Sequence, residues 1–341
     1  MMDGNHSANK STTKIWPWRQ VLAKYEKPQN RASIWQIVSS IVPFLVLWYL
    51  MYLSLSVSYW LVLALAPFAA GFMVRIFIIF HDCGHGSFFK SKKAKNFWGF
   101  ITGILTFTPY HQWRHDHAVH HATACDLDRR GVGDVWMLTV EEYRNLPRRK
   151  KLTYRIYRNP LVMFTVGAFY LFLINNRFPT PGAARRERHS VYWTNLAILG
   201  ISVIMSLAIG FVNFVLIQLP VLAMAASAGV WLFYVQHQFE GVYWERHEKW
   251  DYVKAALYGS SFYKLPRILQ WFTGNIGFHH VHHLGQRVPN YHLERCYREN
   301  RLFQEVKPVT LRSSLKSLTL RLWDEKQHKL VGYKVLRTSH S

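Results

Sequence analysis

HHVHH, residues 279–283, is one of three histidine clusters in the chain; the others are HDCGH at 81–85 and HDHAVHH at 115–121. Residues three and four apart lie on the same face of a helix. The first cluster has the spacing HxxxH and the other two share HxxHH, so the imidazoles of each cluster can point toward one place. A single HxxxH would be weak evidence, because it is also found on polar helix faces. Three clusters in one chain predict that they meet at a metal site.

Eight histidines of the clusters lie on these shared faces and are the expected metal ligands: His81, His85, His117, His120, His121, His279, His282 and His283. Neutral imidazole is a ligand for Fe, Zn, Cu and Ni. Eight ligands exceed the four that one zinc ion takes in proteins, so we expect two metal ions. The sequence does not choose the metal, because affinity alone does not select it.

Apolar runs long enough to cross a membrane, which takes about 20 residues, alternate with basic stretches. The four expected spans are residues 34–56, 60–80, 191–210 and 214–235. Shorter apolar segments at 97–110 and 161–174 predict interfacial or re-entrant helices, and 311–323 predicts an amphipathic helix. Arg75 is the one Lys or Arg within a span; we expect it to reach the interface, with contact to a lipid phosphate as the alternative.

Basic residues predict the orientation of these spans. Six Lys and Arg precede residue 34, 18 lie between residues 81 and 190, and 17 follow residue 235. The positive-inside rule then places both termini and the long middle region in the cytoplasm, on the same side as all three clusters. The expected fold is an all-α integral membrane protein: four transmembrane helices in two hairpins, with a cytoplasmic helical cap that holds a histidine-ligated dimetal site.

The expected division of the chain follows the spans. It comprises a cytoplasmic tail (1–33, disordered to about residue 13), a first hairpin (34–80), a first cap segment with two clusters (81–190), a second hairpin (191–235) and a second cap segment with the third cluster (236–341). The three cysteines are too few and too widely spaced for a disulfide framework. The formal net charge of +23 follows from this topology, so we expect an anionic membrane surface as a partner and no nucleic acid.

The residues around the clusters resemble the histidine boxes of the membrane fatty-acid desaturases. The matching stretches are FHDCGHGSFFK (80–90), QWRHDHAVHHAT (112–123), WLFYVQHQFEGVYWE (231–245) and LQWFTGNIGFHHVHHLGQRVPNY (269–291). The resemblance extends over about residues 34–323. In detail it is most similar to bacterial acyl-lipid desaturases of the Δ5 type, and second to those of the Δ12 type.

This resemblance implies an O2-dependent oxidoreductase with two iron ions, which introduces a cis double bond into acyl chains of membrane phospholipids. Two electrons would come from a ferredoxin or flavodoxin, since the sequence has no haem, nucleotide or iron–sulfur motif of its own. The resemblance also implies a ninth ligand, His237, which follows the fourth span. Some animal relatives hold a metal through water with an Asn one helical turn earlier, where this chain has Phe233. We expect no catalytic residues beyond the metal ligands.

Several polar residues near the clusters are candidates to orient a ligand imidazole through its other ring nitrogen. They are Asp82, Asp116, Glu240, Glu245, Asn275 and His280, with Asp134 as a weaker candidate. The aromatic residues Tyr110, Trp113 and Trp136 could line a substrate tunnel, although core packing is the favoured interpretation.

Two alternatives remain open at this point. Membrane hydroxylases and ketolases of alkanes, sterols or carotenoids share the same ligand pattern, and only the flanking residues favour a desaturase. A metal transporter or sensor is a different class, but transporters place their ligands near the bilayer midplane, whereas these histidines follow span ends.

Overall fold

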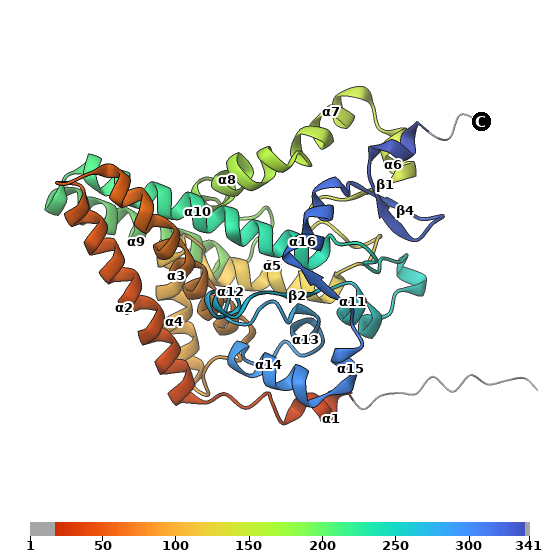
Figure 1. The fold of residues 1–341 in the computed structure, drawn as a ribbon, viewed down its shortest axis with the longest axis horizontal. Coiled ribbons are helices and arrows are strands. Elements are labelled where there is room, and N and C mark those ends of the chain that lie inside the picture. The colour runs from red at the N-terminus through yellow and green to blue at the C-terminus, as the bar shows by residue number, and fades with distance from the viewer. Residues whose placement is uncertain (1–17, 338–341) are drawn as a thin grey trace, which may run out of the picture.

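Four long helices dominate the region of the chain that the computed structural model describes, residues 18–337. They are α2 (Asn30–Ser54), α3 (Tyr59–His85), α9 (Arg185–Ile209) and α10 (Phe211–His237), and each is long and apolar enough to cross a membrane. The four expected spans are therefore confirmed as helices, and the expected disordered tail lies outside the described residues. Figure 1 shows α2, α3 and α9 on the left of the molecule and the strands β1 and β4 on the right.

Local sequence sets where these helices begin and end. The Ser58 hydroxyl accepts a hydrogen bond from the Trp60 backbone and starts α3. At the other end Gly86, with φ of 74°, adopts the left-handed conformation that glycine tolerates best. Small side chains along α3, among them Ala66 and Ala70, allow α2 and α10 to pack closely against it. Because α3 continues to His85, the first histidine cluster forms its last turn rather than following it.

Short helices complete the rest of the chain. They are α1 (Trp18–Ala23), α4 (Lys92–Leu105), α5 (Tyr110–Thr123), α6 (Val140–Asn145), α7 (Arg148–Tyr157), a π-helical segment (Val162–Gly167), α8 (Ala168–Leu173), α11 (Tyr252–Tyr258), α12 (Arg267–Phe272), α13 (His279–Leu284), α14 (Asn290–Glu299), α15 (Arg301–Gln304) and α16 (Leu311–Ser314). The chain bends by 71° between α7 and the helical segment Val162–Arg177, which would form a fifth span if the two halves cross together.

Two small sheets correct the all-α prediction. Strand β4 (Leu322–Asp324) lies between β1 (Leu138–Thr139), to which it is parallel, and the antiparallel β5 (Lys329–Val331); β2 (Phe262–Lys264) is parallel to β3 (Pro308–Thr310). The prediction of an amphipathic helix at 311–323 was wrong. After α16 the chain makes a 3-10 segment, Leu315–Thr319, and then enters β4, where pairing with β1 outweighs helical periodicity.

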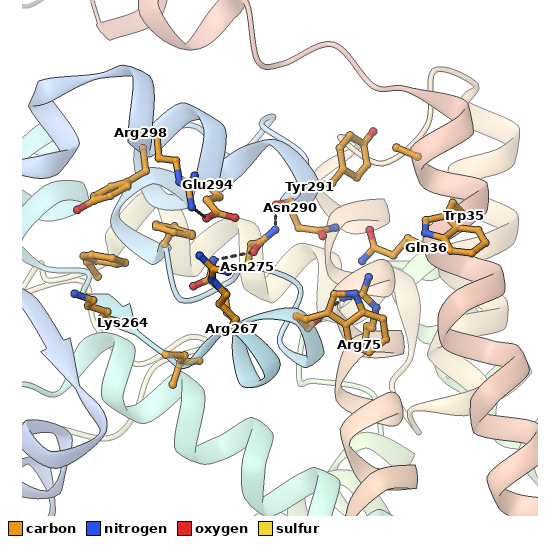
Figure 2. A pocket seen from close by; sticks show the side chains of 17 residues that line it. Trp35, Gln36, Arg75, Lys264, Arg267, Asn275, Asn290, Tyr291, Glu294 and Arg298 are labelled. Atoms are coloured by element: carbon orange, nitrogen blue, oxygen red, sulfur yellow. Dashed lines mark hydrogen bonds and ion pairs between the residues drawn. The ribbon is translucent and has the colours of Figure 1, made fainter.

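A cavity of about 730 Å³ lies beside the long helices, and Figure 2 shows the side chains around it. Its walls come from α2, α3, α12, α14 and the chain next to them. No histidine of the three clusters lines it.

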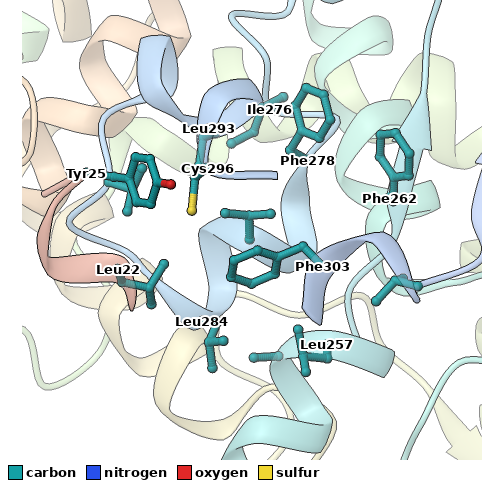
Figure 3. Packing of buried hydrophobic residues seen from close by; sticks show 14 of the residues in the cluster. Leu22, Tyr25, Leu257, Phe262, Ile276, Phe278, Leu284, Leu293, Cys296 and Phe303 are labelled. Atoms are coloured by element: carbon teal, nitrogen blue, oxygen red, sulfur yellow. The ribbon is translucent and has the colours of Figure 1, made fainter. Parts of the chain in front are cut away.

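A hydrophobic core supports α13, the helix that carries the third cluster (Figure 3). Six residues are too few for an isolated helix to be stable in water, so packing must hold α13 in place. Val281 and Leu284 of α13 are buried among residues from distant regions of the chain, including Leu22 and Phe303. The third cluster is thereby fixed against the rest of the cap.

Candidate metal centre

Four helices bring the nine expected ligands together. His81 and His85 come from the last turn of α3, His117, His120 and His121 from α5, His237 from the end of α10, and His279, His282 and His283 from α13. The i, i+3, i+4 spacing gives α5 and α13 one histidine face each, as the sequence predicted. The ends of α3 and α10 deliver the remaining imidazoles to the same region.

The nine imidazoles form two groups. The five-histidine group consists of His81, His85, His117, His121 and His282, whose ligand atoms lie within 4.8 Å of one another. The ligand atoms of His120, His237 and His283 likewise lie within 4.8 Å of one another and form a second set. Nε2 of His279 lies 3.0 Å from Nε2 of His237 and 3.1 Å from Nε2 of His283. We therefore count His279 with that second set and call these four residues the four-histidine group.

Distances between ring nitrogens indicate that each group fits a metal ion. Nε2 of His237 lies 3.2 Å from Nε2 of His120 as well as 3.0 Å from Nε2 of His279. Nε2 of His121 is 3.1 Å from Nε2 of both His117 and His282. A ring nitrogen carries one hydrogen or one lone pair, so it does not hydrogen-bond well to two other ring nitrogens. Nitrogens that share an ion at about 2.0–2.1 Å lie about 3 Å apart, as these do.

Hydrogen bonds at the other ring nitrogen orient three of the imidazoles. Nδ1 of His81 lies 3.0 Å from Oδ1 of Asp82, and Nδ1 of His120 lies 2.6 Å from Oδ1 of Asp134. Nδ1 of His237 is 3.2 Å from the carbonyl oxygen of Gly259. These acceptors favour a hydrogen on Nδ1, which leaves the Nε2 lone pair free for a metal.

Asp134 is the residue that sequence reasoning ranked too low. It lies 14 residues beyond His120, after a tight loop in which Gly133 has φ of 70°. A Cβ at Gly133 would lie 3.0 Å from Cβ of His120, so glycine lets the loop approach the ligand helix. The glycines that precede Asp134 in this loop were the only sequence signal, because the spacing gives no helical register with His120.

The other orienting candidates have different partners, apart from Asp82. Among the acids, Asp116 bonds to exposed His115, Glu240 pairs with Lys316, and the Glu245 carboxylate accepts from the Arg246 backbone. Asn275 donates to the Asn290 carbonyl, and Nε2 of His280 donates to the Phe303 carbonyl. Glu240 and Asp116 lie toward solvent, where a nearby sequence position does not imply contact with the site. His280 is buried but faces away from both groups, as its helical position predicts.

Aromatic rings contribute packing around the groups. The indole of Trp113 stacks on the His117 imidazole, with ring centroids 4.3 Å apart. Phe233 lies 5.2 Å from both His120 and His237, measured between ring centroids. Tyr110 is buried in the core and donates to the Cys83 carbonyl, whereas Trp136 packs against Tyr154 but stays 37% exposed, so core packing fits Tyr110 alone of these two.

Burial keeps five of the clustered histidines, all on α5 and α13, in the form that binds metal. It lowers the pKa of these five well below the ordinary value of 6.5, and neighbouring imidazoles lower it further: His117, His121, His279, His282 and His283. Neutral imidazole has the free lone pair that a metal needs. Buried His280, outside the groups, has its pKa lowered to about 3 by the same loss of solvent.

Comparisons with known proteins point in one direction. A family model described as "Fatty acid desaturase" matches residues 58–313. A protein named "Fatty acid desaturase" from Bacillus subtilis is 52% identical over 316 residues, which cover 93% of this chain and 90% of that protein. From Synechocystis sp., an "sn-1 acyl-lipid omega-3 desaturase (ferredoxin)" is 28% identical over 65% of this chain and 62% of its own length. An "sn-1 oleoyl-lipid 12-desaturase" from the same source is 27% identical over 65% and 63%.

Proposed function

The chain belongs to the fatty acid desaturase family, and from this we propose that it inserts a cis double bond into acyl chains of membrane phospholipids with two iron ions bound by its nine clustered histidines. Fatty acid desaturases are oxidoreductases. The observation that carries the ligand assignment is the convergence of Nε2 atoms, 3.0–3.2 Å apart, from α5, α10 and α13, with His81 and His85 of α3 in the same cluster. The five-histidine group would hold one ion and the four-histidine group the other.

The reaction explains why the site contains so few acids and bases. Neighbouring methylene groups have no acidic proton, so general acid–base catalysis has nothing to act on; the bound iron pair would supply an oxidant derived from O2. Removing two hydrogens while O2 becomes two waters requires two further electrons and two protons, which a separate donor must provide. The protein's role is to hold the metal ligands, to orient His81 and His120 through hydrogen bonds from Nδ1 to the Asp82 and Asp134 carboxylates, and to exclude water from the acyl chain.

The regioselectivity proposed is Δ5, with Δ12 as the alternative, and it depends on the resemblance of the sequences around the histidine clusters. The donor proposed is a ferredoxin or flavodoxin. One relative carries ferredoxin in its name, and a small acidic protein would be attracted to a chain with a formal net charge of +23. O2 and the acyl chains of phospholipids complete the expected partners.

We propose that the long helices form two transmembrane hairpins, with both termini and the histidines in the cytoplasm. The proposed tail ends at residue 33, the first hairpin at 80, the first cap segment at 190 and the second hairpin at 235; the second cap segment follows. Support comes from the basic residues and from the apolar side chains that the long helices expose, such as Leu207 at 83%. Such surfaces suit lipid better than water. Cysteines placed at exposed Val57 and Val212 should react with an impermeant reagent only from outside, and labelling from the cytoplasm would contradict this arrangement.

Lipid analysis of an expressing host tests the function directly. Gas chromatography with mass spectrometry of dimethyl disulfide adducts reports the position of any new double bond. A new bond at carbon 5 is expected, whereas one at carbon 9 or 12 would overturn the regioselectivity but leave desaturation intact. A new hydroxyl group instead would favour the hydroxylase alternative, and metal uptake without any lipid change would favour a transporter.

A further inference from the structure

The cavity between α2, α3, α12 and α14 has two buried polar side chains with unmet hydrogen-bonding capacity. Arg75 of α3 and Gln36 of α2 are 8% and 3% exposed. Within residues 18–337, Nε of Arg75 and Nε2 of Gln36 have no hydrogen-bond partner. Buried donors are nearly always paired, and both of these donors belong to residues that line the cavity. The cavity therefore favours a ligand that offers acceptor oxygens.

Arg75 is held in place rather than extended toward solvent. Its guanidinium stacks on the Trp271 ring, 4.0 Å from the ring centroid, and donates to the Trp271 carbonyl. The expectation that Arg75 simply reaches the interface therefore gives way to a fixed position in the cavity wall. A fixed guanidinium is suited to phosphate, because its planar set of donors matches phosphate oxygens.

The charges around the cavity favour an anion. Arg298 and Glu294 neutralise each other through an ion pair of 2.5 Å. Lys264 and Arg267 have no ion-pair partner among residues 18–337 and, with Arg75, leave three cations facing the space. Figure 2 shows Gln36 and Arg75 on one side of the cavity and Lys264 on the other.

Exposed apolar side chains lie in or next to the walls of the same cavity, on α2 and α12. Trp35, a lining residue in the first turns of α2, is 70% exposed. Helix α12 exposes Ile268 at 71% and Trp271 at 43%. Indole rings are favoured at the membrane–water interface, where one edge stays hydrated. An anion that enters between such residues would carry an apolar portion, as a lipid does.

Hydrogen bonds join the cavity wall to the histidine clusters. Asn275 and Asn290 both line the cavity, and Asn275 donates to the Asn290 carbonyl. Asn290 donates to Oδ2 of Asp82 from its backbone and from its side chain, at 2.7 and 2.8 Å. Oδ1 of Asp82 in turn holds Nδ1 of His81. An anionic headgroup in this cavity would therefore lie near the reacting end of its acyl chain, and a bond close to the ester requires such a short separation.

We propose that this cavity binds the phosphate of a membrane glycerophospholipid and so positions its acyl chain against the histidine groups. The inference builds on the proposed function, because it assigns the portion of the substrate that the histidines do not contact. Gln36 and Arg75 supply the buried contacts to the phosphate, and Lys264 and Arg267 supply long-range attraction.

Binding to the purified full chain in neutral detergent tests this assignment without turnover. The probe is dihexanoyl phosphatidylglycerol, titrated by calorimetry. The double variant Lys264→Gln, Arg267→Gln removes two of the three cations that attract the phosphate and should weaken binding about tenfold. Arg75→Gln should weaken it by at least as much. Arg312→Gln, an exposed cation on α16 away from the cavity, is the matched control and should bind as the unaltered chain does.

The outcomes separate this inference from the proposed function. Unchanged affinity in both cavity variants would overturn the inference, as would equal competition by inorganic phosphate, which would identify a free anion as the ligand. Iron content and desaturation are measured on the same samples. Weakened binding in a protein that desaturates no lipid would support the cavity and contradict the function. Normal binding in both variants together with intact desaturation would reject the cavity and leave the function standing.

Discussion

The two histidine groups are built from overlapping sets of helices but are held in different ways. In the four-histidine group, His120 is fixed by the Asp134 carboxylate and His237 by a backbone carbonyl. In the five-histidine group, His81 has a carboxylate partner, whereas Nδ1 of His121 and of His282, like Nδ1 of His279 in the other group, has no partner within residues 18–337. Their orientation depends on ring packing. The four-histidine group has an acceptor at two of its four rings and the five-histidine group at one of its five. Loss of an acceptor should therefore affect the four-histidine group more, and a change in packing the five-histidine group more.

The largest effect is expected from His237→Ala, which removes a proposed ligand from the smaller group. Desaturation should be abolished and bound iron should fall from two ions toward one per chain, because the remaining three nitrogens leave that ion underligated. Iron is measured by mass spectrometry and double bonds by lipid analysis. His280→Ala is the control, since His280 bonds to the Phe303 carbonyl instead. Full activity in His237→Ala would refute its role as a ligand.

A smaller effect is expected when the carboxylate behind His120 is removed. Asp134→Ala should lower iron affinity or activity by about 10–100-fold, the usual cost of losing such a partner. Asp134→Asn keeps an acceptor oxygen and should cost less. Asp116→Asn provides the matched control, because Asp116 bonds to exposed His115. Equal damage from the Asp116 and Asp134 variants in a chelator competition assay would show that the four-histidine group does not depend on this acceptor.

Packing around the five-histidine group is tested by Gly84→Ala. An added Cβ would lie 2.9 Å from the Trp113 ring and push it against His117, on which it stacks. Such overpacking costs about 1–3 kcal/mol, so we expect a lower melting temperature and activity reduced several-fold. Gly229→Ala in α10 is the control, because no atom lies within 4 Å of its added Cβ. Equal melting temperatures for the two variants would mean that Trp113 moves aside freely.

The smallest effect concerns Glu299, a carboxylate outside both groups. Hydrogen bonds from Arg295, and then from Tyr25 and Lys24, lower the pKa of Glu299 from 4.5 to about 2. A depressed pKa in the folded state adds stability that is complete above about pH 4.5 and is lost as the pH falls toward 2. Glu299→Gln should therefore slightly lower the melting temperature at pH 7 and flatten its acid dependence below pH 4.5. An unchanged slope there would show that Glu299 does not contribute to the acid sensitivity.

Local patterns predicted much of this arrangement. Spacing within the clusters predicted the helix faces, and apolar length predicted the four long helices. Contacts between distant segments were beyond reach: the approach of Asp134 to His120 depends on a glycine loop, and strand β4 at Leu322 depends on pairing with residues near 138. Arg75 illustrates the same limit, because its position is set by Trp271, which lies 196 residues away.

Helix α13 contributes to both histidine groups, with His282 in one and His279 and His283 in the other. This placement has a consequence for biosynthesis. A ribosome has translated about four-fifths of the chain before either proposed ligand set exists in full, so each proposed ion would gain its complete set of ligands only after the last of the four ligand helices has been made. A truncated product that stops before residue 279 would contain every long helix and remain incapable of completing either centre.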